Sequence, residues 1–213
     1  MNSAAPKTRR RWLTLLLAGV LVGELGGVAY VWPAMTARWH AGPERLHPQP
    51  PARPATWAQP LAAAGLKNFH KVSPNLYRGA RPTPEGIAQL KALGVKTVVN
   101  LEVFHRDENM LAGTGMGLVN ISFKALHPER EDMVRFLKVV TDPNLTPVFV
   151  HCMHGSDRTG TMCAVYRIAV QGWSKPEAID EMLQGGFGFH TDLQNLPAFL
   201  DRLDVEKLKR ESR

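Results

Sequence analysis

A thiol, a glycine and an arginine stand close together in the stretch from His151 to Gly160, which reads HCMHGSDRTG. Cys152 and Arg158 are separated by five residues, with Gly155 between them. A loop of this length can curl so that successive backbone N–H groups point into one concavity that binds a tetrahedral anion. Arg158 adds a planar fork of donors for two phosphoryl oxygens. The stretch predicts a phosphate site whose other binding positions are Met153, His154, Gly155, Ser156 and Thr159.

Cys152 would lie at the centre of this electropositive loop, and such surroundings favour a thiolate. A thiolate can attack phosphorus in line while the N–H groups and Arg158 hold the remaining oxygens, which gives a phosphocysteine that water later hydrolyses. Thr159 can donate a hydrogen bond to the sulfur, and His151 can influence its ionisation. We therefore predict hydrolysis of a phosphate monoester with Cys152 as the nucleophile, and we expect neither a metal nor another cofactor.

Two other interpretations of Cys152 are open. A free cysteine is often a small buried hydrophobic residue, and the neighbouring His151 and His154 also suggest a zinc site. Three ligands within four residues do not easily converge on one tetrahedron, however, and no second Cys/His cluster follows. Cys163 lies about 15 Å away along the helix expected after the loop, too far for an unstrained disulfide.

The elements around this stretch are predicted from apolar periodicity and from Pro and Gly positions. The expected strands cover residues 71–78 (a strand or hairpin), 95–101, 117–123 and 147–150, and the expected helices 84–93, 130–140, 159–172 and 175–183. This order predicts an α/β fold with a central, largely parallel sheet of about four to five strands, flanked by helices. The 151–160 stretch would then join a strand to a helix at the sheet edge where such folds bind ligands.

In that setting, His-Cys-x5-Arg-Thr-Gly resembles the signature of the cysteine-dependent protein tyrosine and dual-specificity phosphatases. Residues 76–102 resemble the front half of the compact atypical type found in plants, fungi and bacteria, and residues 171–175 resemble the segment after the loop helix. The likeness runs from about Phe69 to His190. It implies a dual-specificity phosphatase-like fold, a phosphorylated protein or small phosphate monoester as substrate, and a substrate cleft bordered by Arg78 and Arg81.

The proton donor for the leaving group is the open question of this site. Most relatives carry an aspartate on a separate loop upstream of the cysteine, where this chain has residues 120–123, NISF. Asp157 is the favoured acid because it lies in the loop itself, as in myotubularin-like phosphatases, although it can equally brace the loop by accepting N–H bonds. Glu129 and Asp132 are the alternative acids. A missing upstream acid also leaves open an inactive phosphate-binding module, and a sulfurtransferase-like enzyme is a third possibility.

The amino-terminal part has a different composition. A basic tail, residues 1–11, precedes an apolar run at 12–32 that is long enough to cross a bilayer as a helix and is interrupted only by Glu24. Positive charge before the run predicts an extracytoplasmic catalytic domain. The alternative is export followed by cleavage of the segment as a signal. A Pro-rich tether at 33–65 would join the apolar helix to a phosphatase domain at 66–213.

The formal net charge of +7 does not indicate nucleic-acid binding. Residues 1–60 hold seven Lys/Arg against two Asp/Glu, and the rest of the chain nineteen against seventeen. The excess is therefore concentrated before the domain, and no basic and aromatic stripe follows it. Nothing in the pattern indicates an oligomeric state.

Overall fold

The structure, a computed structural model, describes residues 53–213. The predicted basic tail at 1–11, the apolar helix at 12–32 and most of the predicted tether lie outside the described residues. Among residues 53–213, no helix has the length and apolarity that a bilayer crossing requires.

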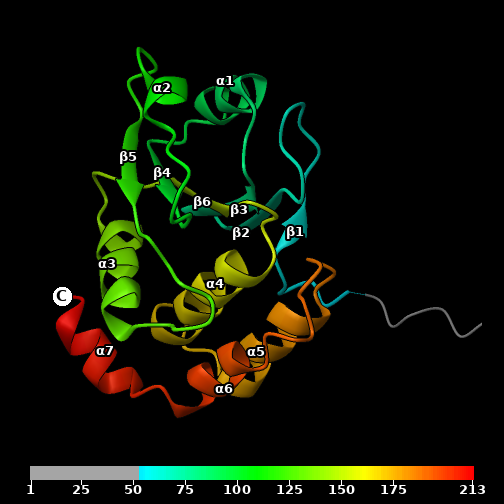
Figure 1. Cartoon of the computed structure of the whole chain (residues 1–213), viewed down its shortest axis with the longest axis vertical. Helices are drawn as coiled ribbons and strands as arrows, with labels where there is room; N and C mark the ends of the chain where they lie inside the picture. Colours follow the sequence, from blue (N-terminus) through cyan, green and yellow to red (C-terminus); the bar gives the residue numbers. More distant parts are fainter. Residues whose placement is uncertain (1–52) are drawn as a thin grey trace, which may run out of the picture. The chain divides into compact units, whose positions relative to one another are not determined.

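Six strands form one mixed sheet in the order β1-β2-β3-β6-β4-β5 (Figure 1). The strands are β1 Gln59–Pro60, β2 His70–Ser73, β3 Leu76–Ala80, β4 Thr97–Asn100, β5 Gly117–Asn120 and β6 Val148–Cys152. The last four in spatial order are parallel, whereas β1, β2 and β3 pair antiparallel. The α/β class is confirmed, and the sheet differs from the expected four to five strands by its short antiparallel edge.

Two helices lie on one face of the sheet and the remaining five on the other (Figure 1). The first two are α1 Pro84–Ala92 and α2 Glu108–Leu111, and the others are α3 Arg130–Thr141, α4 Asp157–Ala169, α5 Lys175–Gln184, α6 Asn195–Arg202 and α7 Val205–Glu211. Alternating strand residues point to the two faces of the sheet. Val98 of β4 therefore packs with α1, whereas Val99 belongs to the hydrophobic core on the face covered by the other five helices.

Helix α4 is the centre of the larger layer, since every residue from Thr159 to Ile168 is buried. A buried ion pair joins it to α5: the Arg167 guanidinium donates to both carboxylate oxygens of Glu181 at 2.7 Å. Arg167 also donates to the carbonyl oxygen of Val72 on β2. The helix that follows the 151–160 stretch is thus fixed from two sides.

The segment before residue 66 is folded where the structure describes it. Ala58 is buried, its N–H donates to Glu181, and β1 pairs with β2. The tether predicted for 33–65 therefore does not extend through residues 58–65, which belong to the domain. In the sequence, one apolar alanine and a strand of two residues do not indicate folded structure, because the nearby prolines favour an extended tether.

Candidate active site

Cys152 is the last residue of β6, and α4 begins five residues later at Asp157. Its thiol is buried at the carboxyl end of the parallel strands, opposite Ala80 of β3. We call residues 152–158 the phosphate loop. The predicted order of strand, loop and helix is confirmed, and the positive end of the α4 dipole points into the loop.

The phosphate loop turns its carbonyl groups outward. Those of residues 153–156 accept hydrogen bonds, in order, from the Arg81 N–H, the Asn68 side-chain amide, the Arg78 guanidinium and the Gly160 N–H. Within residues 53–213, no backbone N–H from Met153 to Thr159 has a protein acceptor. The phosphate loop therefore presents a set of unpaired donors around Cys152, which is the arrangement that binds a tetrahedral anion.

Gly155 makes the tight turn of the phosphate loop possible. Its φ of +72° lies in the left-handed region. A Cβ atom at this position would lie 2.4 Å from the backbone carbon of Gly79 on β3. Only glycine therefore allows the loop to approach the strand this closely.

Arg78 supports the phosphate loop from below. Its side chain is fully buried, and Nη2 donates to the carbonyl oxygen of Gly155 at 2.7 Å. The guanidinium lies 3.6 Å from the ring centre of Phe187, which holds it by a cation–π contact. The resemblance placed Arg78 at the border of the substrate cleft, but its position on a central strand puts it under the loop instead.

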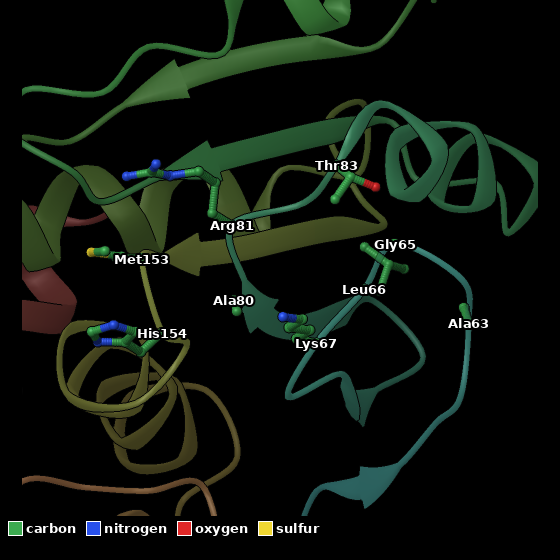
Figure 2. Close-up of a pocket in the computed structure, with 9 residues that line it drawn as sticks. All are labelled: Ala63, Gly65, Leu66, Lys67, Ala80, Arg81, Thr83, Met153 and His154. Atoms are coloured by element: carbon green, nitrogen blue, oxygen red, sulfur yellow. The ribbon is translucent and has the colours of Figure 1, made fainter. Parts of the chain in front are cut away.

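Arg158 comes from the first turn of α4 and is partly exposed. Its Nη1 donates to the carbonyl oxygen of Leu101 at 3.3 Å. It lines a cavity of about 470 Å³ together with Arg81, Glu102, Val103, Phe104, His105 and Met153. A second cavity of about 550 Å³ shares Arg81 and Met153; Figure 2 shows it lined by Met153 and His154 on one side and by Leu66 and Lys67 on the other.

A buried polar network lies behind Cys152. The Nε2 atom of His151 is 2.8 Å from Oδ2 of Asp107, whose other oxygen pairs with His105. Burial alone would raise the pKa of Asp107, but the hydrogen bond with His151 holds that pKa below its ordinary value. The Nε2 atom of His151 is thus committed to Asp107, and among residues 53–213 no group of three or more His, Cys, Asp or Glu side chains is arranged to hold a metal ion.

Arg81 lines both cavities, and its partner Glu102 lines the smaller one. Arg81 donates through Nε to Oε1 of Glu102 at 2.8 Å and through Nη2 to Oε2. Burial would raise the pKa of Glu102, but the hydrogen bonds from Arg81 hold that pKa below its ordinary value. Arg81 therefore borders the cleft as the resemblance implies, with its charge already neutralised.

Asp157 is held by a residue that sequence reasoning did not single out. Its Oδ1 accepts the backbone N–H of His190 at 2.8 Å, and its Oδ2 lies 2.8 Å from Nδ1 of the same residue. The hydrogen bond with Asp157 raises the pKa of His190 above its ordinary value. Asp157 thus has the bracing contacts expected of it as an alternative to direct acid catalysis, and both of its oxygens are engaged.

Glu129 and Asp132 have no such link to the site. In the described part of the chain, the side-chain hydrogen bonds and ion pairs of the phosphate loop involve neither of these carboxylates. Burial and the charge of Glu129 raise the pKa of Asp132. That shift is the only feature that would suit Asp132 to an acid's role.

Two further expectations concern hydroxyl and thiol groups. The buried Thr159 hydroxyl has no hydrogen-bond partner among residues 53–213, so the expected bond to the Cys152 sulfur is not formed. Cys163 is a core residue of α4, and burial raises its pKa to about 11. Both cysteines are free.

Fold and site together define a class of protein. Three features together are those of a cysteine-dependent phosphatase: a buried cysteine at a strand end, a loop of outward carbonyls and inward donors, and an arginine in the first turn of the following helix, separated from the cysteine by five residues. A family model described as a DSP-PTPase phosphatase fused to NAD+ kinase matches residues 61–194.

Individual relatives agree with this class. The chain is 38% identical over 202 residues to dual specificity protein phosphatase TpbA of Pseudomonas aeruginosa, covering 93% of this chain and 84% of that protein. A structure of a cysteine-to-serine TpbA variant in complex with phosphotyrosine has a TM-score of 0.67 and 33% identity, covering 75% of this chain and 98% of that one. The chain therefore belongs to the dual-specificity-type phosphatase family.

A more distant relative is named for a different substrate. Inositol diphosphatase DSP3 of Arabidopsis thaliana is 27% identical over 150 residues, which cover 67% of this chain and 72% of that protein. The family thus includes proteins named as protein phosphatases and proteins named as inositol diphosphatases.

Proposed function

We propose that this chain hydrolyses phosphate monoesters through a phosphocysteine on Cys152. The observation that carries the proposal is the phosphate loop. The carbonyl groups of residues 153–156 are held outward by hydrogen bonds, and the N–H groups from Met153 to Thr159 have no protein acceptor among residues 53–213. Such preorganised donors stabilise the charge that develops on the transferred phosphoryl oxygens. Arg158 swings from Leu101 to hold two of these oxygens when phosphate is bound.

The reaction has two halves. The Cys152 thiolate attacks phosphorus as the bond to the ester oxygen breaks, and that oxygen leaves with the bonding electrons and takes up a proton. Water then attacks the phosphocysteine; its proton is removed, the S–P bond breaks, and thiolate and inorganic phosphate are released. The α4 dipole and the N–H groups stabilise the thiolate in both halves.

The two cavities favour an aromatic phosphate ester. The larger one is lined by four small or apolar side chains next to the phosphate loop, Ala63, Leu66, Ala80 and Met153. The smaller one is bordered by Phe104, whose side chain is 98% exposed. An aromatic ring on phosphate can lie against Met153 while flanking peptide contacts Phe104.

Inositol phosphates fit these surroundings less well. Arg81 is neutralised by Glu102. Of the other cations that line the two cavities, Lys67 and Arg158 have no ion-pair partner within residues 53–213. Several phosphate groups on one inositol ring would need more positive charge than this. We therefore propose phosphotyrosine in proteins as the substrate.

The test is a panel of substrates on wild type and Cys152→Ser. We expect turnover of 4-nitrophenyl phosphate and of phosphotyrosine peptides, with at least 10-fold lower kcat/KM for an inositol diphosphate. Cys152→Ser should abolish turnover of every substrate while keeping the circular-dichroism spectrum of the folded protein. Turnover by Cys152→Ser would contradict the mechanism, and binding without turnover by wild type would favour the inactive module. Thiosulfate turnover would favour the sulfurtransferase.

We also propose that residues 12–32 place this domain outside the cytoplasm, either as an anchor or as a cleaved signal, because of the basic tail and the apolar run. A full-length chain expressed in a bacterial host should expose its domain to protease added to spheroplasts. A domain protected in spheroplasts and degraded only after lysis would contradict this. Retention in the membrane pellet after an alkaline wash would distinguish the anchor from the cleaved signal.

A further inference from the structure

The region opposite the phosphate loop holds a histidine that has no assigned role. Residues 186–190, which follow α5, form a segment of alternating glycine and aromatic residues ending in His190. The described structure fastens this segment to the phosphate loop at two points. The Ser156 hydroxyl donates to the carbonyl oxygen of Phe187 at 2.8 Å, and Asp157 holds both the backbone N–H and the ring of His190.

The core fixes the segment from the other side. The Phe187 ring is buried between Arg78 and His70, and its carbonyl oxygen also accepts a hydrogen bond from the Asn68 side chain. The segment therefore cannot shift without disturbing Arg78, the residue that supports Gly155. His190 is held in place by the same contacts that hold the phosphate loop.

The His190 ring is oriented for proton transfer. Its Nδ1 faces Oδ2 of Asp157, which leaves Nε2 directed away from that carboxylate. The centre of the His190 ring lies 5.9 Å from that of His154. The imidazole therefore lies near two residues of the phosphate loop, Asp157 and His154. The side chain is 52% exposed, so a substrate or water can reach Nε2. A carboxylate on Nδ1 with a reachable Nε2 is the arrangement in which histidine exchanges protons with a reacting group.

We propose that His190, positioned by Asp157, is the general acid that protonates the leaving group. This rests on the proposed function. As the P–O bond breaks, its electron pair stays on the ester oxygen, which takes the proton from Nε2. The alcohol or phenol leaves, and His190 is then neutral and keeps its Nδ1 proton, which it donates in the hydrogen bond to Asp157. In the second half Nε2 accepts a proton from the attacking water, and the protonated ring is restored.

This assignment changes the role of Asp157 from acid to positioning residue. Asp157 also sets the pH range, because the charged and titratable groups that face His190 are Asp157, Asp192 and His154, and the two carboxylates raise the pKa of His190. The acid form is lost as pH rises through that pKa. The basic limb of kcat should therefore lie above the ordinary histidine value of about 6.5, and Asp157→Asn should move it to lower pH.

Leaving-group dependence separates a proton donor from a structural residue. His190→Asn keeps a side-chain N–H toward Asp157 but removes the transferable proton, and His127→Asn, at an exposed histidine on another loop, is the matched control. With phenyl phosphate, whose leaving group needs a proton, His190→Asn should lose about 10²-fold or more in kcat. With 4-nitrophenyl phosphate, whose phenolate leaves without one, the loss should be several-fold at most.

An equal loss on both substrates, or no loss, would overturn the proposal, as would a selective loss in Glu129→Gln or Asp132→Asn. If His190→Asn does not fold, wild type gives the answer: its dependence on leaving-group basicity should become steeper as pH rises through the basic limb, and an unchanged dependence would contradict the assignment. Failure of the proposed function would look different, since Cys152→Ser would then retain turnover of both substrates.

Discussion

The Arg78 guanidinium donates to the carbonyl oxygen of Gly155 from inside the core, 2.7 Å away, so the floor of the phosphate loop is a buried charge rather than an apolar side chain. This contact holds one of the four outward carbonyl groups on which the inward direction of the N–H groups depends. The ability to bind phosphate is therefore built partly from a strand residue 74 positions before Cys152.

Arg78→Met should weaken phosphate binding more than it weakens the fold. The Gly155 carbonyl would lose its donor in a buried setting, which costs about 1–3 kcal/mol, and the phosphate loop would lose its fixed shape. We expect at least a 10-fold higher inhibition constant for vanadate. Arg106→Met, at an exposed arginine, is the control. An unchanged inhibition constant in Arg78→Met would show that the loop keeps its shape without this support.

Gly155→Ala should prevent formation of the phosphate loop. The methyl group would meet the Gly79 backbone at 2.4 Å in addition to the cost of a positive φ. Gly172→Ala is a matched control, because Gly172 has φ +73° with open space around its Cβ position. Thermal unfolding should show that the free energy of unfolding falls by about 1–2 kcal/mol in the control and by clearly more in Gly155→Ala. We also expect no measurable turnover by Gly155→Ala. Equal losses would mean that close approach to β3 is unimportant.

Glu181→Ala should destabilise the domain strongly. It leaves Arg167, which is 2% exposed, without its bidentate partner, and removing one member of a buried ion pair costs about 3–5 kcal/mol. It also removes the acceptor of the Ala58 N–H. Glu206→Ala, in the exposed pair with Lys209, should cost about 0.5 kcal/mol or less. Urea unfolding compares the two, and a loss for Glu181→Ala within the range of the control would contradict the anchoring role given to this pair.

Acid should destabilise the domain through Asp107. Its folded pKa is held below the ordinary value of about 3.9, so its contribution is present above that value and is lost as pH falls. When urea unfolding is measured between pH 7 and pH 3, the free energy of unfolding should therefore decline less in Asp107→Asn than in wild type. Asp201→Asn, at an exposed aspartate of α6, should follow wild type. A decline in Asp107→Asn as large as in wild type would contradict the pairing with His151.

The sequence predicted those parts of the site that are local in the chain. Cys152, Gly155 and Arg158 lie within one short loop, and the strand before it and the helix after it have strong apolar patterns. The parts it did not predict depend on distant contacts. Arg78 looks like a turn residue beside Gly79, and its burial follows from pairing of β3 with β6.

His190 was missed for a related reason. It lies 33 residues after Asp157 in the sequence, and a histidine after a glycine and aromatic run has no periodicity that indicates a role. The sequence also did not predict β1 and α2, because elements of two and four residues are too short to show a periodic pattern. Helix α6 was not predicted because it contains Pro197, which is unusual inside a helix. Leu208 of α7 is fully buried, although the residues around it in the sequence are mostly charged.

The central claim is a covalent phosphocysteine on Cys152, and an acid quench during turnover tests it most directly. Wild type mixed with excess 4-nitrophenyl phosphate, quenched within milliseconds and digested, should yield one phosphorylated peptide that contains Cys152. The same peptide should carry no phosphate in Cys152→Ser. Phosphate found instead on His151 or His154, or steady turnover with no phosphorylated peptide at any quench time, would contradict the account.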